Sequence, residues 1–142
     1  MLTFQEDNKD VNVYLYLRSQ VKWIGLKEEQ AQMALDNSLK IITVYKDEKP
    51  VAMGRVVGDG AVICYIQDLI VIPECQGMHI GSMVIEKLIE YVKSLTLPGS
   101  RIMLDLMCAK GREAFYKKHG FVERPNDRLG PGMIQYIEAE EN

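Results

Sequence analysis

Residues 68–81 read DLIVIPECQGMHIG, and this stretch decides the fold. It begins with β-branched and aliphatic residues typical of a strand, which Pro73 ends. A short loop containing Gly77 follows and leads into a predicted helix. Such a strand-loop-helix junction collects unpaired backbone N–H groups and the positive end of the helix dipole at one point. We therefore expect a phosphate-binding loop that is neither a P-loop nor a GxGxxG turn.

The helix after this loop is the best defined in the sequence and is predicted over Met78–Leu95. Its apolar residues recur at helical spacing, and charged residues occupy the other faces. Residues 97–100, LPGS, end it. The strand before it is predicted over Ala61–Ile72, and an alternating strand after it over Arg101–Met107. Strand, helix and strand in this order predict a crossover between parallel strands.

The first 60 residues predict two helical segments and an antiparallel part of the sheet. Residues 10–17 are ambiguous between a helix and a strand by periodicity, and Lys27–Asn37 is rich in good helix formers; we interpret both as helical. The Asp59-Gly60 pair predicts a tight two-residue hairpin. Strands are expected at Leu2–Phe4, Ile41–Tyr45 and Val51–Val57.

The last third predicts a short helix over Gly111–His119, ended by Gly120. A brief strand at Phe121–Val122, a polar loop and a final strand at Met133–Ile137 follow. We therefore expect an α/β fold in one domain, residues 1–142, with a mixed sheet of about seven strands flanked by helices.

Composition excludes several classes of protein. The 142 residues carry a formal charge of -3, so no basic field predicts nucleic-acid binding. The three cysteines lack CxxC spacing and only two histidines are present, which predicts neither a disulfide framework nor a metal site. No apolar run approaches the ~18 residues of a membrane span and no leader pattern opens the chain, so we expect a cytoplasmic protein without membrane contact.

Two motifs resemble the GNAT superfamily of acyl-CoA-dependent N-acyltransferases. Residues 71–74, VIPE, match V-x-P-E, and Gln76 and Gly81 match Q/R-x-x-G-x-G/A, with His79 where the middle glycine stands. Residues 114–121, AFYKKHGF, are similar to the family's F-Y-x-K-x-G-F segment. Ala109 stands where many members carry an asparagine.

The resemblance implies a binding site for acetyl-CoA. In this fold the strand holding Leu69 splays from the strand holding Leu104, and the pantetheine arm enters the gap. Main-chain groups of Leu69, Ile70 and Val71 would pair with its amides as an added strand does. The pyrophosphate would be held by the loop residues Gln76, Gly77, Met78, His79, Ile80, Gly81 and Ser82. Tyr116 would also contact the cofactor.

The reaction implied is transfer of an acetyl group to a primary amine of a small molecule or peptide, without a metal. The strand N–H near Leu69 would stabilise the oxyanion, and the Tyr116 phenol would protonate the departing thiolate. Two candidates remain for the base, Asp68 and a water relay.

Two function classes remain open: the enzyme, and a non-catalytic CoA or acyl-CoA sensor of the same fold. The departures at His79 and Ala109 keep the sensor open as an alternative, and retention of Tyr116 favours the enzyme. The acceptor pocket is expected to be built from the N-terminal helices, with Tyr14, Tyr16 and Trp23, and from the loop Arg124–Gly132. Both a monomer and a homodimer are compatible with the sequence.

Overall fold

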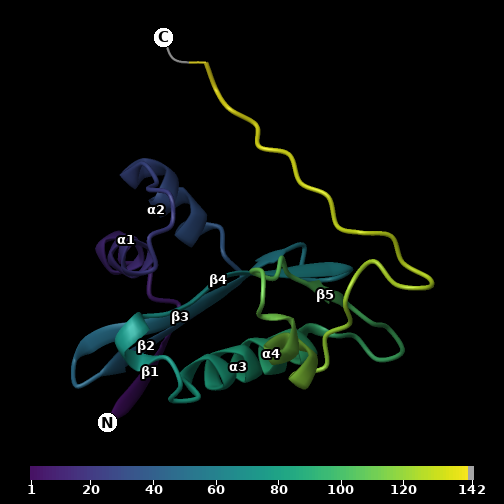
Figure 1. Ribbon diagram of the computed structural model, residues 1–142, viewed down its shortest axis with the longest axis horizontal. Helices are drawn as coiled ribbons and strands as arrows, with labels where there is room; N and C mark the ends of the chain where they lie inside the picture. The colour runs from purple at the N-terminus through teal and green to yellow at the C-terminus, as the bar shows by residue number, and fades with distance from the viewer. Residues whose placement is uncertain (141–142) are drawn as a thin grey trace. The chain divides into compact units, whose positions relative to one another are not determined.

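Five strands form one mixed sheet in the order β1-β2-β3-β4-β5 (Figure 1). Strands β1 to β4 pair antiparallel with one another in this order, and β5 runs parallel to β4. The parallel step follows helix α3, which confirms the predicted crossover. The strands are β1 Leu2–Glu6, β2 Lys40–Lys46, β3 Lys49–Gly58, β4 Ile63–Val71 and β5 Met103–Asp105.

The structure is a computed structural model that describes residues 1–140. It divides into two units, Met1–Leu106 and a second that begins at Met107. The first unit holds all five strands and helices α1 to α3, and the second holds helix α4, Glu113–Lys118. Each unit is described by itself below.

Helices cover both faces of the sheet in the first unit. Helices α1, Val11–Gln20, and α2, Glu28–Asp36, lie on one face, and α3, Ile80–Leu95, lies on the other (Figure 1). The Asp10 carboxylate accepts a hydrogen bond from the Asn12 amide at 2.9 Å and caps α1. Residues 10–17, whose periodicity allowed a helix or a strand, therefore belong to a capped helix.

The core lies between the sheet and these helices. Leu17 of α1 and Leu35 of α2 are fully buried on one face, and Val84 and Leu88 of α3 on the other. Residues of β4 alternate between half-buried and buried along the whole strand. The alternation resembles the period-two pattern of a strand, which is interrupted where the pairing of β3 with β4 shifts register between Met53 and Arg55.

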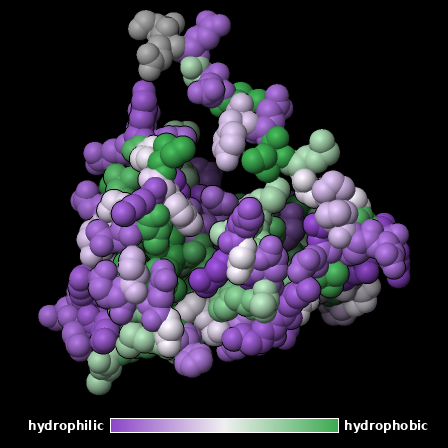
Figure 2. Space-filling view, in the orientation of Figure 1, coloured by the Kyte–Doolittle hydropathy of each residue, from purple (hydrophilic) through white to green (hydrophobic). Residues whose placement is uncertain are grey.

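The structure corrects the predicted strand count from seven to five. Residues 121–122 and 133–137 are not strands, and the side chains of Met133, Ile134 and Ile137 are exposed. Figure 2 shows hydrophobic and hydrophilic residues mixed along this C-terminal segment. An alternating pattern favours a strand only when a partner supplies backbone hydrogen bonds, and within residues 1–140 this segment pairs with none.

The structure also corrects the predicted two-residue hairpin. Four residues, 59–62, connect β3 to β4. The Asp59 carboxylate accepts hydrogen bonds from the amides of Ala61, Val62 and Ile63 at 2.8 to 3.0 Å. Because one side chain satisfies three amides, a wider loop is stable where the Asp-Gly pair predicted a tight turn.

Across residues 1–140, no helix has the length and apolar character needed to cross a membrane.

Candidate active site

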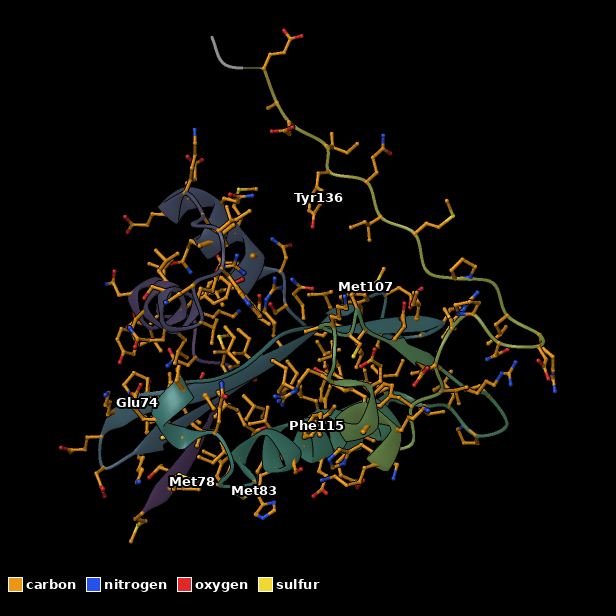
Figure 3. All side chains as sticks on the ribbon, viewed as in Figure 1. Glu74, Met78, Met83, Met107, Phe115 and Tyr136 are labelled. Carbon is orange, nitrogen blue, oxygen red and sulfur yellow. The ribbon has the colours of Figure 1, made fainter. Side chains whose placement is uncertain are left out.

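The predicted phosphate-binding loop joins β4 to α3. A 3-10 turn at Pro73–Cys75 follows β4, and the chain then passes Gly77 and His79 into α3. Glu74, Met78 and Met83 mark this path in Figure 3. Gly77 has φ +84° and His79 has φ +62°, both in the left-handed region. His79 therefore adopts the backbone conformation for which the family motif has a glycine.

The first turn of α3 suits an anion. Met83 is the first residue of α3 whose amide reaches a carbonyl one turn back, that of His79 at 3.1 Å. The amides of Ile80 and Gly81 precede it, where a helix offers no carbonyl partner of its own. This first turn carries no acidic residue. The dipole and amides at this end therefore meet no competing carboxylate on the helix itself.

The Gln76 side chain connects the loop to the end of β4 by a hydrogen bond. Its side-chain Nε2 donates a hydrogen bond to the carbonyl of Val71 at 3.0 Å. The Ile72 amide bonds the Val51 carbonyl of β3 at 2.9 Å, and the Cys75 side chain is buried. The backbone N–H of Gln76 donates to the carbonyl of Pro73 at 3.3 Å, so in the structure both the side chain and the backbone of Gln76 hold the shape of the loop, unlike the predicted role of its N–H in anion binding.

The second half of β4 extends past the end of β5. The two strands pair only over residues 63–65 of β4 and 103–105 of β5. Leu69, Ile70 and Val71 lie beyond this pairing, on a stretch of β4 whose β5 side has no strand partner among residues 1–140. An unpaired strand edge presents backbone donors and acceptors to an extended ligand, as the resemblance predicted for the pantetheine arm.

The Asp68 side chain lies on the face of β4 that is covered by α1, and it is buried there. Its carboxylate accepts hydrogen bonds from Tyr14 Oη at 2.5 Å, Arg18 Nη1 at 2.8 Å and Arg55 Nε at 2.8 Å. Burial raises the pKa of Tyr14, and the neighbouring Asp68 charge raises it further. Tyr14 therefore stays protonated and acts as a hydrogen-bond donor to Asp68 at neutral pH.

Tyr116 belongs to helix α4 in the second unit. Its ring packs edge-on against Phe115 at 5.0 Å and Phe121 at 6.0 Å between centroids. Burial raises the pKa of the half-buried Tyr116 phenol, and nearby Cys108 raises it further. The phenol is thus protonated at neutral pH, as a proton donor must be.

The predicted residues fall into two groups. Leu69 to Val71 and residues 76–82 lie consecutively along the first unit, so the strand edge and the anion loop form one continuous segment. Tyr116 lies in the second unit. Sequence reasoning missed the partners of Asp68, which are Tyr14, Arg18 and Arg55. The available signal was a lone carboxylate on the buried face of an apolar strand, which requires buried donors.

Two other features of the described residues are separate from this loop. A groove of about 810 Å³ lies between α3 and strands β1 and β2, with Phe4, Ile42 and Tyr91 in its wall and charged residues at its sides. Within residues 1–140, no cluster of three or more histidine, cysteine, aspartate or glutamate side chains could hold a metal ion.

Comparison with known proteins identifies the family. Residues 9–121 match the sequence model of the acetyltransferase (GNAT) family. The chain therefore belongs to the GNAT family of acetyltransferases, as the two motifs indicated. The five-stranded mixed sheet, with its parallel step at α3, is the fold of its GNAT neighbours.

Three similar proteins illustrate the relationship. An uncharacterized N-acetyltransferase, ycf52, from Pyropia yezoensis is 27% identical over 89% of this chain and 74% of its own length. Serotonin N-acetyltransferase 2, chloroplastic, from Oryza sativa subsp. japonica is 30% identical over 82% of this chain and 58% of its own. The crystal structure of a probable acetyltransferase from meticillin-resistant Staphylococcus aureus is 28% identical, with a TM-score of 0.83 over 96% of this chain and 100% of its own.

Proposed function

We propose that this protein transfers the acetyl group of acetyl-CoA to a primary amine by direct attack within a ternary complex. The observation that carries the proposal is the continuous segment from the open edge of β4 to the first turn of α3. It combines an unpaired strand edge for an amide-containing arm with an anion site one short loop away. Acetyl-CoA has both chemistries, an extended pantetheine with two amides and a pyrophosphate.

The loop backbone supports binding of the pyrophosphate. Left-handed residues at Gly77 and His79 turn the chain sharply before the helix, and the amides of Ile80 and Gly81 precede the hydrogen-bonded part of α3. Main-chain donors do not depend on side-chain identity, so the histidine in place of glycine leaves this mode of binding intact. The side chain of Ser82 adds a hydroxyl in the same turn.

The reaction needs three groups besides the bound thioester. The lone pair of the amine nitrogen attacks the carbonyl carbon, and the negative charge that forms on the carbonyl oxygen is stabilised by the backbone N–H of Leu69. The carbon–sulfur bond then breaks, and the thiolate of CoA takes a proton from the Tyr116 phenol. The attacking amine loses one proton to a base, for which water is the candidate that the contacts of Asp68 favour.

The acceptor is proposed only as a class, a primary amine of a small molecule or peptide. The 30% identical rice protein is named for serotonin, a primary alkylamine that carries an indole ring. Trp23 is partly exposed in the segment between α1 and α2, and it gives the N-terminal helices an aromatic surface for such an acceptor. Alkylamines that carry an aromatic ring are therefore the first members of the panel to test.

Release of CoA thiol tests the proposal. The protein is incubated with acetyl-CoA and with serotonin, tryptamine, a polyamine, amino acids or a peptide, and thiol is measured against a control without acceptor. Amine-dependent release supports the enzyme. Thermal stabilisation by acetyl-CoA or CoA without release for any amine favours the sensor, and no stabilisation by either contradicts both functions.

A further inference from the structure

The buried carboxylate of Asp68 joins three elements of the first unit. Tyr14 and Arg18 reach it from α1, four residues apart on one helix face, and Arg55 reaches it from β3. The Asp68 side chain is fully buried and that of Arg18 is 13% exposed. A buried carboxylate with two cationic partners and one hydroxyl donor is held in one orientation. We call these four residues the Asp68 cluster.

The backbone of Asp68 is irregular at the same place. Its φ of +58° lies in the left-handed region, within a strand. The pairing of β3 with β4 shifts register there: Met53 pairs with Ile70, while Arg55 pairs with Gln67. Asp68 and Leu69 thus oppose the single residue Gly54, which defines a β-bulge. Such a conformation persists in a residue other than glycine when its surroundings over-determine it, as the Asp68 cluster does.

The bulge sets the direction of the Leu69 N–H. This N–H belongs to the peptide plane between Asp68 and Leu69, and the backbone torsions of Asp68 orient that plane. Arg55 pairs with Gln67 in the ladder and bonds Asp68 through its side chain, so it anchors the bulge to β3 twice. A change in the side-chain contacts of Asp68 can therefore rotate its backbone and so change the direction of the Leu69 N–H, the proposed oxyanion donor.

The cluster also reaches the segment that connects α1 to α2, residues 21–27. The second terminal nitrogen of Arg18, Nη2, donates to the carbonyl of Ile24 at 2.9 Å. The same guanidinium lies over the Trp23 ring, 5.3 Å from its centroid. One arginine thus holds both the carboxylate behind the bulge and the turn that carries Trp23.

We propose that Asp68 is a positioning residue of the acetyl transfer, and that Arg18 couples the bulge to the acceptor segment 21–27. The proposal rests on the proposed function, because it assigns the Leu69 N–H to the acetyl carbonyl. It gives Asp68 no role as proton acceptor, because three buried donors from Tyr14, Arg18 and Arg55 already engage its carboxylate. An acceptor that orders residues 21–27 would strengthen the contacts that hold the oxyanion donor.

Steady-state kinetics test the positioning role. The change Asp68→Asn keeps the shape of the side chain and removes its charge. We expect kcat to fall about 100-fold, because small misplacement of a catalytic group has an effect of this size. The fall is uniform across pH, the shape of the pH–rate profile is unchanged, and the KM for acetyl-CoA changes far less than kcat. Loss of the acidic limb of the profile in Asp68→Asn would identify a base and overturn the proposal.

Two milder variants guard against loss of folding. Tyr14→Phe removes one hydrogen bond and should lower kcat in the same uniform manner to a smaller degree. Arg18→Lys keeps the charge but cannot reach both Asp68 and Ile24 with a planar fork, so it should also raise the KM for the amine. Lys40→Met is the matched control, because Lys40 is 15% exposed and pairs with two carboxylates, Glu6 and Asp7, away from the bulge. It should leave kcat and both KM values unchanged.

Hydrogen exchange gives a readout that does not depend on turnover. In Asp68→Asn and Tyr14→Phe, peptides covering residues 66–71 and 21–27 should exchange faster together, and in Lys40→Met neither should change. Unchanged exchange in both segments of both variants overturns the coupling, whatever the kinetics show. If no amine on the panel is acetylated, the proposed function fails while the exchange result still decides whether the cluster holds the bulge.

Discussion

Gly54 of β3 lies directly under Leu88 of α3. A Cβ built on Gly54 would come 2.9 Å from Leu88 Cδ1 and 2.9 Å from Val84 Cγ1, and 3.4 Å from Leu69 Cδ1. Helix α3, which begins at the anion loop, thus packs on the sheet at Gly54, the residue that opposes the bulge. No side chain fits at this position. Because α3 and the Leu69 side chain both pack against Gly54, a larger residue there would displace α3, the bulge or Leu69.

The change Gly54→Ala should therefore destabilise the protein and slow the reaction. Forcing a methyl group into a filled contact costs about 1–3 kcal/mol in the free energy of unfolding. The displaced α3 or Leu69 should also raise the Kd for CoA. Gly25→Ala is the control, because nothing lies within 4 Å of its added Cβ. Urea denaturation and calorimetric titration with CoA measure both effects; equal stability of the two variants would contradict this contact.

Replacing His79 by glycine should stabilise the protein. A left-handed conformation costs about 1–2 kcal/mol for most residues, while glycine loses about 0.4–1 kcal/mol more through the unfolded chain. A net gain of about 0.5–1 kcal/mol in the free energy of unfolding follows, with CoA affinity maintained by the loop amides. Met78→Gly has no positive φ to relieve and should be destabilising. Lower stability of His79→Gly than of the parent protein would show that the imidazole makes a compensating contact.

The proposed acid predicts a pH dependence of turnover. Because burial raises the pKa of the Tyr116 phenol, the protonated form persists above the ordinary value of about 10. We expect kcat to stay constant toward alkaline pH and to fall only as pH rises through that raised pKa. Tyr116→Phe should lower kcat about 100-fold and abolish the alkaline limb. Tyr136→Phe, at an exposed tyrosine of the same unit, is the control and should match the parent protein.

The loop between β3 and β4 predicts a pH-dependent stability. Hydrogen bonds from the amides of Ile63, Ala61 and Val62 lower the pKa of Asp59. A lowered pKa in the folded state stabilises the fold above the pKa of the unfolded chain, and this contribution is lost as pH falls through the folded pKa. Asp59→Ala should thus lower Tm at pH 7, and the difference from the parent protein should shrink toward pH 2. Asp127→Ala, at another exposed loop aspartate, should show no such trend, and a constant difference for Asp59→Ala would refute the role of the charge.

Much of the fold could be predicted from local pattern. The β-branched and apolar run before Pro73 predicted β4, and burial alternates along it, but the β-bulge at Asp68 interrupts the strict period-two assignment of its residues to the two layers. The helical spacing after Gly77 predicted α3 to within two residues of its start. These signals are reliable because a strand or helix next to a core must repeat its apolar residues at its own geometric period.

The wrong predictions share one cause. The segment at residues 133–137 and the Asp59-Gly60 turn were predicted from composition, but pairing and capping decided their structures. A strand needs a neighbour, and a turn type depends on which amides a nearby carboxylate can satisfy. Neither condition can be read from the few residues concerned.

For the candidate site, the sequence by itself determined the family and the order of strand, loop and helix, because these depend on contiguous residues such as 71–81. Only the tertiary structure decided that Asp68 sits in a bulge, buried between two arginines and a tyrosine. Tyr14 and Asp68 are 54 positions apart in the chain, and no local pattern encodes such a contact. The fold creates it by packing α1 against the face of β4 to which the bulge at Asp68 turns the carboxylate.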